Sequence, residues 1–486
     1  MLKVLVSGAL YNIVNIVAQI LLGLVVFREM LLHFGEADFG TWSLLFAILA
    51  HVKLFEFGLG SIISKLVPIL KNGDSKNVSY FSTAIVAMVV VFAAFLAVLI
   101  AVAFIGGQEA LQFQGTEAFT LVLFLIGCNF LFLYLTGAFH AYLTGSFKVG
   151  RLNSVRLFIN ILRSVLIIGF LQFNSSVVIV AYIFALTSLL ELLLLFLISV
   201  KSGLFEDLDL STCSISSFSY VAERGYKLFF LSVNDYVRQN ALVIVCGFIV
   251  GVIAIVPLRI AGRLMEIYTQ ISVSLNYILT PYFSTIAIGD NDSVNKKFLI
   301  SINCATTLSA MVFLNIVFVG DWFLALWLGD VPQYTSEVMK IIAIGFFIET
   351  MQGPCTSLLI SKDKNKIIMV LCILEASILI AIISPFVKIF GIIGAAYAIV
   401  VSLGLIRGVF QPIIIKKVLK VPLFTYYANL MVPTVVIALN ISFLKLVAMS
   451  FSFTNEDFTL ISFIALQAIV ALAAAFHLRS EVGEKN

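Results

Sequence analysis

Residues 81–105, FSTAIVAMVVVFAAFLAVLIAVAFI, contain no charged side chain and decide the fold class. A helix that crosses a bilayer needs about 20 mostly apolar residues. The apolar residues of this stretch are continuous and do not alternate with polar ones, so the stretch predicts a spanning helix and not a barrel strand.

Comparable apolar segments recur along the whole chain. Of the 486 residues, 61% are hydrophobic and 12% are charged, whereas soluble domains carry about 25% charged residues. We predict an all-α polytopic membrane protein with about 14 transmembrane helices. The predicted spans are 8–32, 39–64, 79–105, 118–143, 153–172, 177–200, 227–249, 254–286, 298–321, 338–360, 367–388, 391–415, 426–450 and 458–478. The first is longer than the apolar region of a signal peptide, so we expect it to be retained as a membrane span.

The six cysteines are scattered and form no Cys-x-x-Cys pair. We expect them to be buried packing residues, with no disulfide and no metal site. No dense basic run accompanies the net charge of +4, so nucleic acid is not an expected partner.

The charge of the loops alternates along the chain, which predicts the orientation of the protein. One set of loops is basic and includes Lys65, Lys71, Lys76, Lys148, Arg151, Arg156, Lys201, Arg224, Lys227, Lys296, Lys297, Lys362, Lys364, Lys366, Lys416, Lys417, Lys420, Arg479 and Lys485. The other set, 106–117, 172–176, 320–330 and 450–457, contains no lysine or arginine. Basic loops face the cytoplasm, so both termini are predicted to be cytoplasmic.

Reporter fusions test this topology. We expect cytoplasmic signals from fusions at Lys71, Lys148, Ser211, Lys364 and Lys417, and outer-side signals from fusions at Gln112 and Gly329. An outer-side signal at Lys364 would contradict the number of spans in the second half.

The chain is predicted to consist of two similar halves. Gly35 and Gly251 open short outer turns 216 residues apart, and Gly137 and Gly353 have the same separation. The predicted parts are an N-terminal lobe (1–200), a cytoplasmic linker (201–226), a C-terminal lobe (227–415) and a final helix pair with a cytoplasmic tail (416–486). Parallel repeats of this kind usually enclose a substrate site near the membrane midplane.

Several motifs resemble those of a known transporter family. They are LLHFGEADFGTWSLLFAI (31–48), FEFGLGSIISKLVPIL (55–70), PYFSTIA (281–287) and GIIGAAYAIVVS (391–402). Together they resemble the O-antigen flippases, polysaccharide transporters within the multidrug/oligosaccharidyl-lipid/polysaccharide exporter superfamily.

The resemblance implies a two-lobed carrier without enzymatic activity or cofactor. Its expected cargo is an undecaprenyl-diphosphate-linked oligosaccharide, which it would move across the bacterial inner membrane during O-antigen and lipopolysaccharide synthesis. A polysaccharide polymerase and the chain-length machinery are possible partners under this reading.

Polar side chains recur at helical spacing inside the predicted spans, as in the fifth span, where Arg156, Asn160 and Arg163 are spaced four and three residues apart. A charge at the centre of a span costs at least about 2.5–3.5 kcal/mol, so it normally faces protein or water. The predicted cavity residues are Asn15, Gln19, Lys53, Asn160, Arg163, Asn234, Arg238, Arg259, Arg263 and Gln270. The predicted coupling or ion-pair residues are Glu56, Asp235, Glu266 and Glu349. Guanidinium groups bind phosphate oxygens, and amides bind sugars.

A structural interpretation competes with this one. The deep cations are Lys53, Arg163, Arg238, Arg259, Arg263 and Arg407, and the deep acids are Glu56, Glu191, Asp235, Glu266, Glu349 and Glu375. Because the two sets are equal in size, internal ion pairs between helices are an alternative to substrate binding.

Two other functions also remain open. A cation-coupled drug or metabolite antiporter of the same superfamily would favour an acidic cavity. A membrane enzyme of polysaccharide assembly would need a large outer loop, which the predicted topology lacks. No Gly-x-x-x-x-Gly-Lys-Ser/Thr phosphate loop is present in the sequence.

Overall fold

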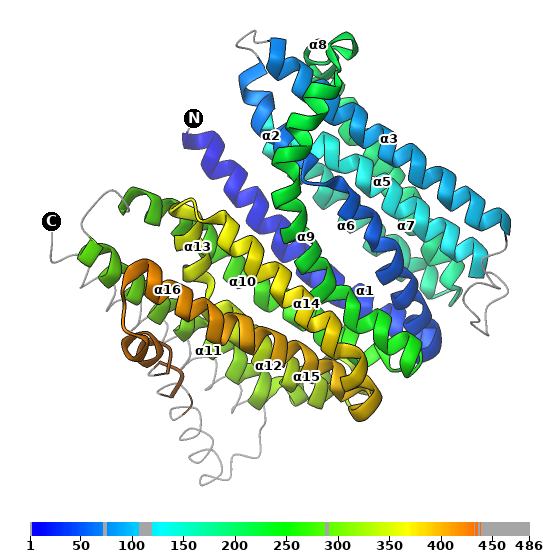
Figure 1. Ribbon diagram of the computed structural model, residues 1–486. Helices are drawn as coiled ribbons and strands as arrows, with labels where there is room; N and C mark the ends of the chain where they lie inside the picture. The colour runs from blue at the N-terminus through cyan, green and yellow to red at the C-terminus, as the bar shows by residue number, and fades with distance from the viewer. Residues whose placement is uncertain are drawn as a thin grey trace. The chain divides into compact units, whose positions relative to one another are not determined.

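The computed structural model describes residues 2–70, 75–105, 119–286, 291–431, 433–435 and 438 (Figure 1). These residues form two compact units, Met1–Val256 and Pro257–Asn486. The predicted span 458–478 and most of 426–450 lie outside the described residues.

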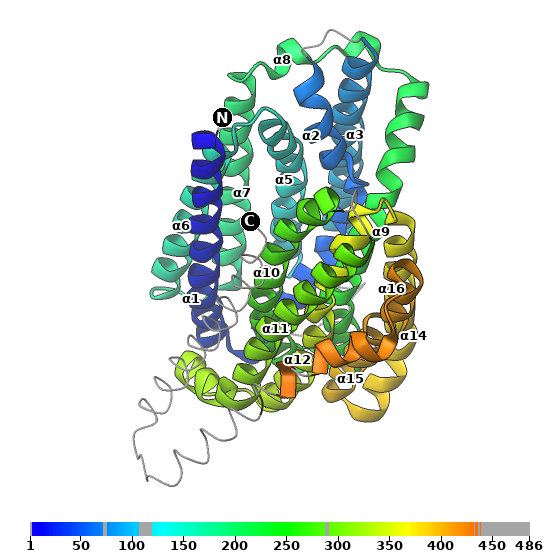
Figure 2. The same ribbon diagram turned by 90° about the vertical axis from the view of Figure 1, so that its left-hand side faces the viewer.

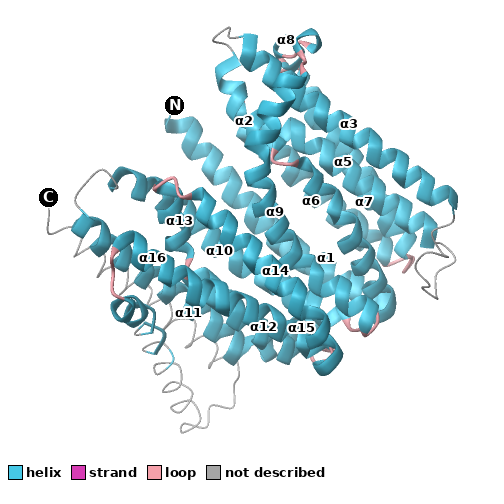
Figure 3. Cartoon of the chain, in the orientation of Figure 1, coloured by secondary structure: helices cyan, strands magenta, loops and turns pink. Residues whose placement is uncertain are grey.

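Within the described residues, the chain is helical and contains no strand (Figure 3). Nine helices in this part are long and apolar enough to cross a membrane, and one of them, Ala18–Leu70, contains the second predicted span and the last part of the first. The all-α prediction is therefore confirmed, and the protein is a multi-pass membrane protein.

The first unit is built from long helices that pack side by side. They are α1 (Leu2–Leu49), η1 (Ala50–Glu56), α2 (Leu59–Leu70), α3 (Ser75–Ile105), α5 (Phe119–Gly145), α6 (Val149–Leu171), α7 (Val177–Val200), α8 (Leu204–Asp207), η2 (Leu210–Thr212) and α9 (Ile215–Ile249). Figure 1 shows α3, α5 and α7 next to one another, α5 packs against both of the others, and α6 packs against α1 and α7.

Glycines mark the breaks between helices in this unit. The backbone of α1 is non-helical at Gly35, where φ is 72°, and Gly251, between α9 and α10, has a φ of 121°. Only glycine adopts such angles without steric cost. The two glycines predicted to be equivalent therefore share one backbone feature, although the repeat itself stays a prediction.

The second predicted span, 39–64, is not one continuous helix. It consists of the end of α1, the 3-10 helix η1 and the start of α2. Phe57 and Gly58 separate η1 from α2 with φ values of 46° and 71°. Helix α9 passes close to this break, because a Cβ added at Gly225 would lie 2.2 Å from the Phe57 carbonyl oxygen.

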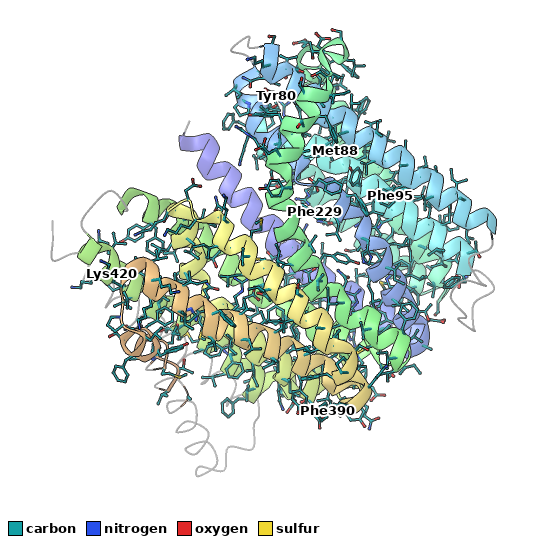
Figure 4. All side chains as sticks on the ribbon, in the orientation of Figure 1. Tyr80, Met88, Phe95, Phe229, Phe390 and Lys420 are labelled. Atoms are coloured by element: carbon teal, nitrogen blue, oxygen red, sulfur yellow. The ribbon has the colours of Figure 1, made fainter. Side chains whose placement is uncertain are left out.

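The predicted linker 201–226 is docked on the first unit. Tyr142 on α5 donates a hydrogen bond to Asp207 at 2.8 Å, and Ser79 on α3 donates one to the Thr212 carbonyl at 2.6 Å. Tyr80, labelled on α3 in Figure 4, stacks on Tyr220 of α9 with ring centroids 3.8 Å apart. These contacts join α9 to the first unit, so the unit boundary follows Val256, whereas the predicted lobe boundary lies within 201–226.

The second unit has its own set of packed helices. They are α10 (Ile255–Ile286), α11 (Asn291–Leu328), α12 (Thr335–Met351), α13 (Gly353–Ser361), α14 (Asn365–Phe390), α15 (Ile392–Leu403), the π-helical turn η3 (Gly404–Phe410) and α16 (Gln411–Leu419). Helix α12 packs against α11 and α15, and α14 packs against α15 (Figure 2).

Two predicted elements differ from the structure in this unit. The segment 320–330, predicted as a loop, is helical as far as Leu328, because only its ends are charged and FLALWL continues the apolar run. Asp321 pairs with Lys340 on α12 at 2.6 Å, which joins the two helices near this end. The predicted span 338–360 is divided at Gln352, where Pro354 stands in the first turn of α13.

Candidate functional site

Helix α6 carries a polar stripe on the side that faces the rest of the first unit. Successive residues of a helix rotate by about 100°, so Arg156, Asn160 and Arg163 share one side. The buried side chains of Ile159 and Ile167 lie on the same side. The exposed apolar side chains on the opposite side are Phe158, Ile161 and Val165. The stripe therefore faces away from the surface of α6 that suits lipid.

Arg163 is held in place by α7. Its Nε donates to Thr187 Oγ1 at 2.8 Å, and its Nη2 donates to Ser188 Oγ at 3.0 Å. Its guanidinium carbon lies 5.0 Å from the centroid of the Phe184 ring. Ser188 in turn donates to Asn129 Oδ1 on α5 at 2.6 Å. Arg163 thus bonds directly to α7 and is connected to α5 through Ser188.

Arg156 has a looser environment on the same stripe. Its Nη1 lies 3.3 Å from Nε2 of His140 on α5, and its Nε lies 3.9 Å from Oε1 of Glu191 on α7. Its side chain is 40% exposed, whereas the Glu191 side chain is only 9% exposed. Arg156 belongs to the polar stripe predicted for this span, although it is not among the predicted cavity residues.

Two amides beside these arginines have spare donors. The Nδ2 atoms of Asn129 and Asn160 are buried and make no hydrogen bond within the described part of the chain. Buried amide donors are normally satisfied by protein, water or a ligand. The region around the stripe can therefore accept further hydrogen-bonding partners.

Other predicted residues of the first unit lie on α1, α9 and the break before α2. Gln19 and Arg238 are half-buried, and Asn234 is buried one turn before Arg238. The carboxylate of Glu56 accepts a hydrogen bond from the Gly60 backbone N–H at 3.2 Å. The side chains that lie outside the described ones are Asn15, Lys53 and Asp235.

An exposed histidine stands in the second predicted span. His51 Nδ1 lies 2.7 Å from the hydroxyl of Tyr236 on α9, and the Tyr236 hydroxyl also donates to the Ala47 carbonyl. The centroids of the His51 and Tyr236 rings are 4.4 Å apart. A polar side chain at this position in a span indicates contact with water or protein and not with lipid.

In the second unit, α10 carries the clearest predicted stripe. Arg263 Nη1 lies 2.5 Å from Glu266 Oε2, and the two side chains are 26% and 48% exposed. Arg259, one turn earlier, is half-buried, and Gln270, one turn after Glu266, is exposed. The structure thus brings Arg263 and Glu266 together as an i,i+3 pair. The predicted Glu349 is half-buried on α12.

A second polar cluster in this unit is fully buried. Arg407 donates from Nε to Glu375 Oε2 at 2.7 Å and from Nη1 to Gln411 Oε1 at 3.3 Å. Gln411 continues the network to the carbonyl of Gln352, whose side chain accepts from Tyr426. Arg407 and Glu375 thus form the internal ion pair that the structural interpretation predicted for deep charges.

The described residues offer no group of His, Cys, Asp or Glu side chains arranged to hold a metal ion. All six cysteines are free, and Cys246, Cys355 and Cys372 are buried.

The fold is similar to that of solved membrane transporters, although the sequence has no match. No protein-family model and no curated protein matches the sequence. Among solved structures, the lipid II flippase MurJ in an inward closed conformation matches with a TM-score of 0.71 at 15% identity, over 98% of this chain and 99% of that one.

Two other solved transporters match over most of the chain. An inward-facing multidrug resistance MATE family transporter of the MOP superfamily has a TM-score of 0.68 at 12% identity, over 83% of this chain and 95% of its own. A MOP superfamily transporter from Pyrococcus furiosus has a TM-score of 0.59 at 13% identity, over 86% and 97%. The chain has the fold of these transporters.

Proposed function

We propose that the protein is a flippase that moves an undecaprenyl-diphosphate-linked oligosaccharide across a bacterial inner membrane by alternating access. The observation that carries this proposal is the presence, in both units, of partly exposed arginines on long helices, namely α6 in the first unit and α10, the predicted span 254–286, in the second. Arg156 represents the first unit and Arg263 the second. Such charges are costly in lipid and normally serve a substrate path.

The chemistry of these side chains suits the two parts of the cargo. Guanidinium groups form two parallel hydrogen bonds with phosphate oxygens, which matches the diphosphate. The amides of Asn160, Asn234 and Gln270 supply both donors and acceptors, which matches sugar hydroxyls. The polyprenyl tail can remain in the bilayer while the polar head crosses.

The extent of the fold match supports a lipid-linked cargo. The match to the lipid II flippase covers 98% of this chain, whereas the multidrug transporter covers 83%. We propose that both termini are cytoplasmic and that a polysaccharide polymerase with its chain-length machinery receives the product. The candidates for coupling transport to an ion gradient are Glu56, Asp235, Glu266 and Glu349.

A drug or metabolite antiporter is the second candidate function. It is favoured by the match to the multidrug transporter, with its TM-score of 0.68. A carrier of organic cations would need a site dominated by acids, whereas each unit here has a partly exposed arginine, Arg156 in the first and Arg263 in the second. The two candidates predict different phenotypes.

Deletion of the gene separates these candidates. We expect the host to lose a surface glycan and to accumulate the lipid-linked repeat on the inner leaflet, because the head group cannot cross unaided. The measurement is surface glycan together with extracted lipid-linked oligosaccharide, with plasmid complementation as the control. Normal glycan combined with new drug sensitivity would favour the antiporter instead.

A further inference from the structure

The two arginines of the α6 stripe differ in how fully their donors are used. Arg163 donates to two hydroxyl groups at 2.8 and 3.0 Å and lies against the Phe184 ring. Within the described residues, Arg156 makes one hydrogen bond, to His140 at 3.3 Å, and its Nε lies 3.9 Å from the Glu191 carboxylate. A guanidinium has five N–H donors, so Arg156 retains capacity for another acceptor.

The exposed part of Arg156 does not face the apolar surface of α6. Arg156 shares the side of Ile159 and Ile167, both of which have no exposed surface. Its 40% exposure therefore lies on the protein-facing side of the helix. A charge there is reached by water or by a polar ligand, and not by lipid tails.

The position of Arg156 along α6 suits a lipid head group. It is seven residues after Val149, the first residue of the helix, which corresponds to about 10 Å along the axis. The predicted topology places that end of α6 at the cytoplasmic side. A phosphate carried by an inner-leaflet lipid would therefore meet Arg156 near the start of its path.

We propose that Arg156 binds the diphosphate of the lipid-linked substrate in the first unit, in exchange for its contacts with Glu191 and His140. The inference rests on the proposed function, because it names the residue that recognises that substrate. Phosphate oxygens at hydrogen-bonding distance would replace a carboxylate that is held 3.9 Å away. The Nδ2 of Asn160, one turn further along the stripe, is a second donor for the same anion.

Glu191 is the competitor in this exchange. Its carboxylate is 9% exposed and neutralises Arg156 while the site is empty of substrate. Removing its charge, while keeping its shape, should leave Arg156 more available to the anion. Glu191 therefore weakens binding of the anion, and the loss of its charge is predicted to strengthen it.

The test is equilibrium binding of undecaprenyl diphosphate to the purified full-length protein in nanodiscs. For Arg156→Gln we expect the affinity to fall roughly ten- to a hundredfold, the range of a hydrogen bond to a charged group. For Glu191→Gln we expect tighter binding than wild type, a gain that misfolding cannot produce. Arg151→Gln is the matched control, because Arg151 is an exposed arginine of the same helix.

The outcomes of this test answer three questions: which molecule supplies the anion, whether Arg156 binds it, and whether the proposed function holds. If unlabelled undecaprenyl diphosphate displaces the labelled lipid, and inorganic pyrophosphate and undecaprenol at equal concentration do not, the site recognises a lipid-borne diphosphate. Equal competition by pyrophosphate points to a site for free phosphate ions and overturns the inference. Unchanged affinity in Arg156→Gln, or no gain in Glu191→Gln, also overturns it while the proposed function stands. A wild type that does not bind undecaprenyl diphosphate overturns both.

Discussion

Replacing Arg407 by alanine is expected to deplete folded protein, by lowering the free energy of unfolding by about 3–5 kcal/mol. The Arg407 and Glu375 side chains are 9% and 2% exposed, so the change leaves a buried carboxylate without its cation. The substitution also removes the hydrogen bond to Gln411. The measurement is the yield of monodisperse protein and its Tm in detergent.

Two further variants make this result specific. Lys417→Ala changes an exposed cation of the adjoining helix α16 and should leave yield and Tm unchanged. The double variant Glu375→Leu with Arg407→Met removes both charges, and it should recover much of the stability lost by Arg407→Ala, because apolar replacements of a buried pair are often neutral. Wild-type Tm in Arg407→Ala would refute a structural role for the pair.

The sequence predicted that Arg407 and Glu375 were deep charges, but it could not predict that they meet. Arg407 lies within the π-helical turn Gly404–Phe410, and such turns arise inside ordinary apolar helices with little local signal. The Gly408 carbonyl in this turn accepts a hydrogen bond from Tyr427 at 2.7 Å. That stabilising contact depends on a residue beyond α16, so only tertiary structure reveals it.

Span positions were more predictable, since apolar length is a local property. The predicted span 177–200 coincides with α7, and 254–286 differs from α10 by a single residue at its start. The broken second span was missed, because the left-handed Phe57 has no signal in FEFGLG beyond its glycines. The start of α9 was missed because Ser214, its N-cap, lies in a segment that is polar overall.

In the candidate site, too, the position of residues on one helix was predictable from the sequence, whereas their contacts with other helices were not. The spacing of Arg156, Asn160 and Arg163 predicted a shared helix side, which rotation along the helix is sufficient to establish. Which arginine would be bonded to α7 could not be predicted, because it depends on the antiparallel register of two helices. That register places Thr187 and Ser188 beside Arg163 and leaves the more distant Glu191 for Arg156.

Replacing Arg263 should strongly reduce transport while leaving the amount of inserted protein unchanged, in contrast to replacing Arg407. Its pair with Glu266 is exposed, at 26% and 48% for the two side chains, so breaking it leaves no buried charge. An exposed pair of this kind contributes about 0–1 kcal/mol to stability. If Arg263 grips the diphosphate, its loss removes a charged hydrogen bond and lowers substrate affinity about tenfold or more.

The measurement is surface glycan per unit of correctly inserted protein, for Arg263→Lys, Arg263→Ala and Glu266→Gln. Lysine keeps the charge but lacks the planar fork of donors, so Arg263→Lys should transport poorly and Arg263→Ala less still. Glu266→Gln breaks the same ion pair and keeps the arginine, so retained transport in this variant would assign the loss to Arg263 itself, and lost transport would support Glu266 as a coupling residue. Equal loss of inserted protein in all three variants would instead assign Arg263 to stability. Normal surface glycan in both Arg263→Lys and Arg263→Ala would show that Arg263 does not bind the substrate, because transport would then not need its guanidinium group.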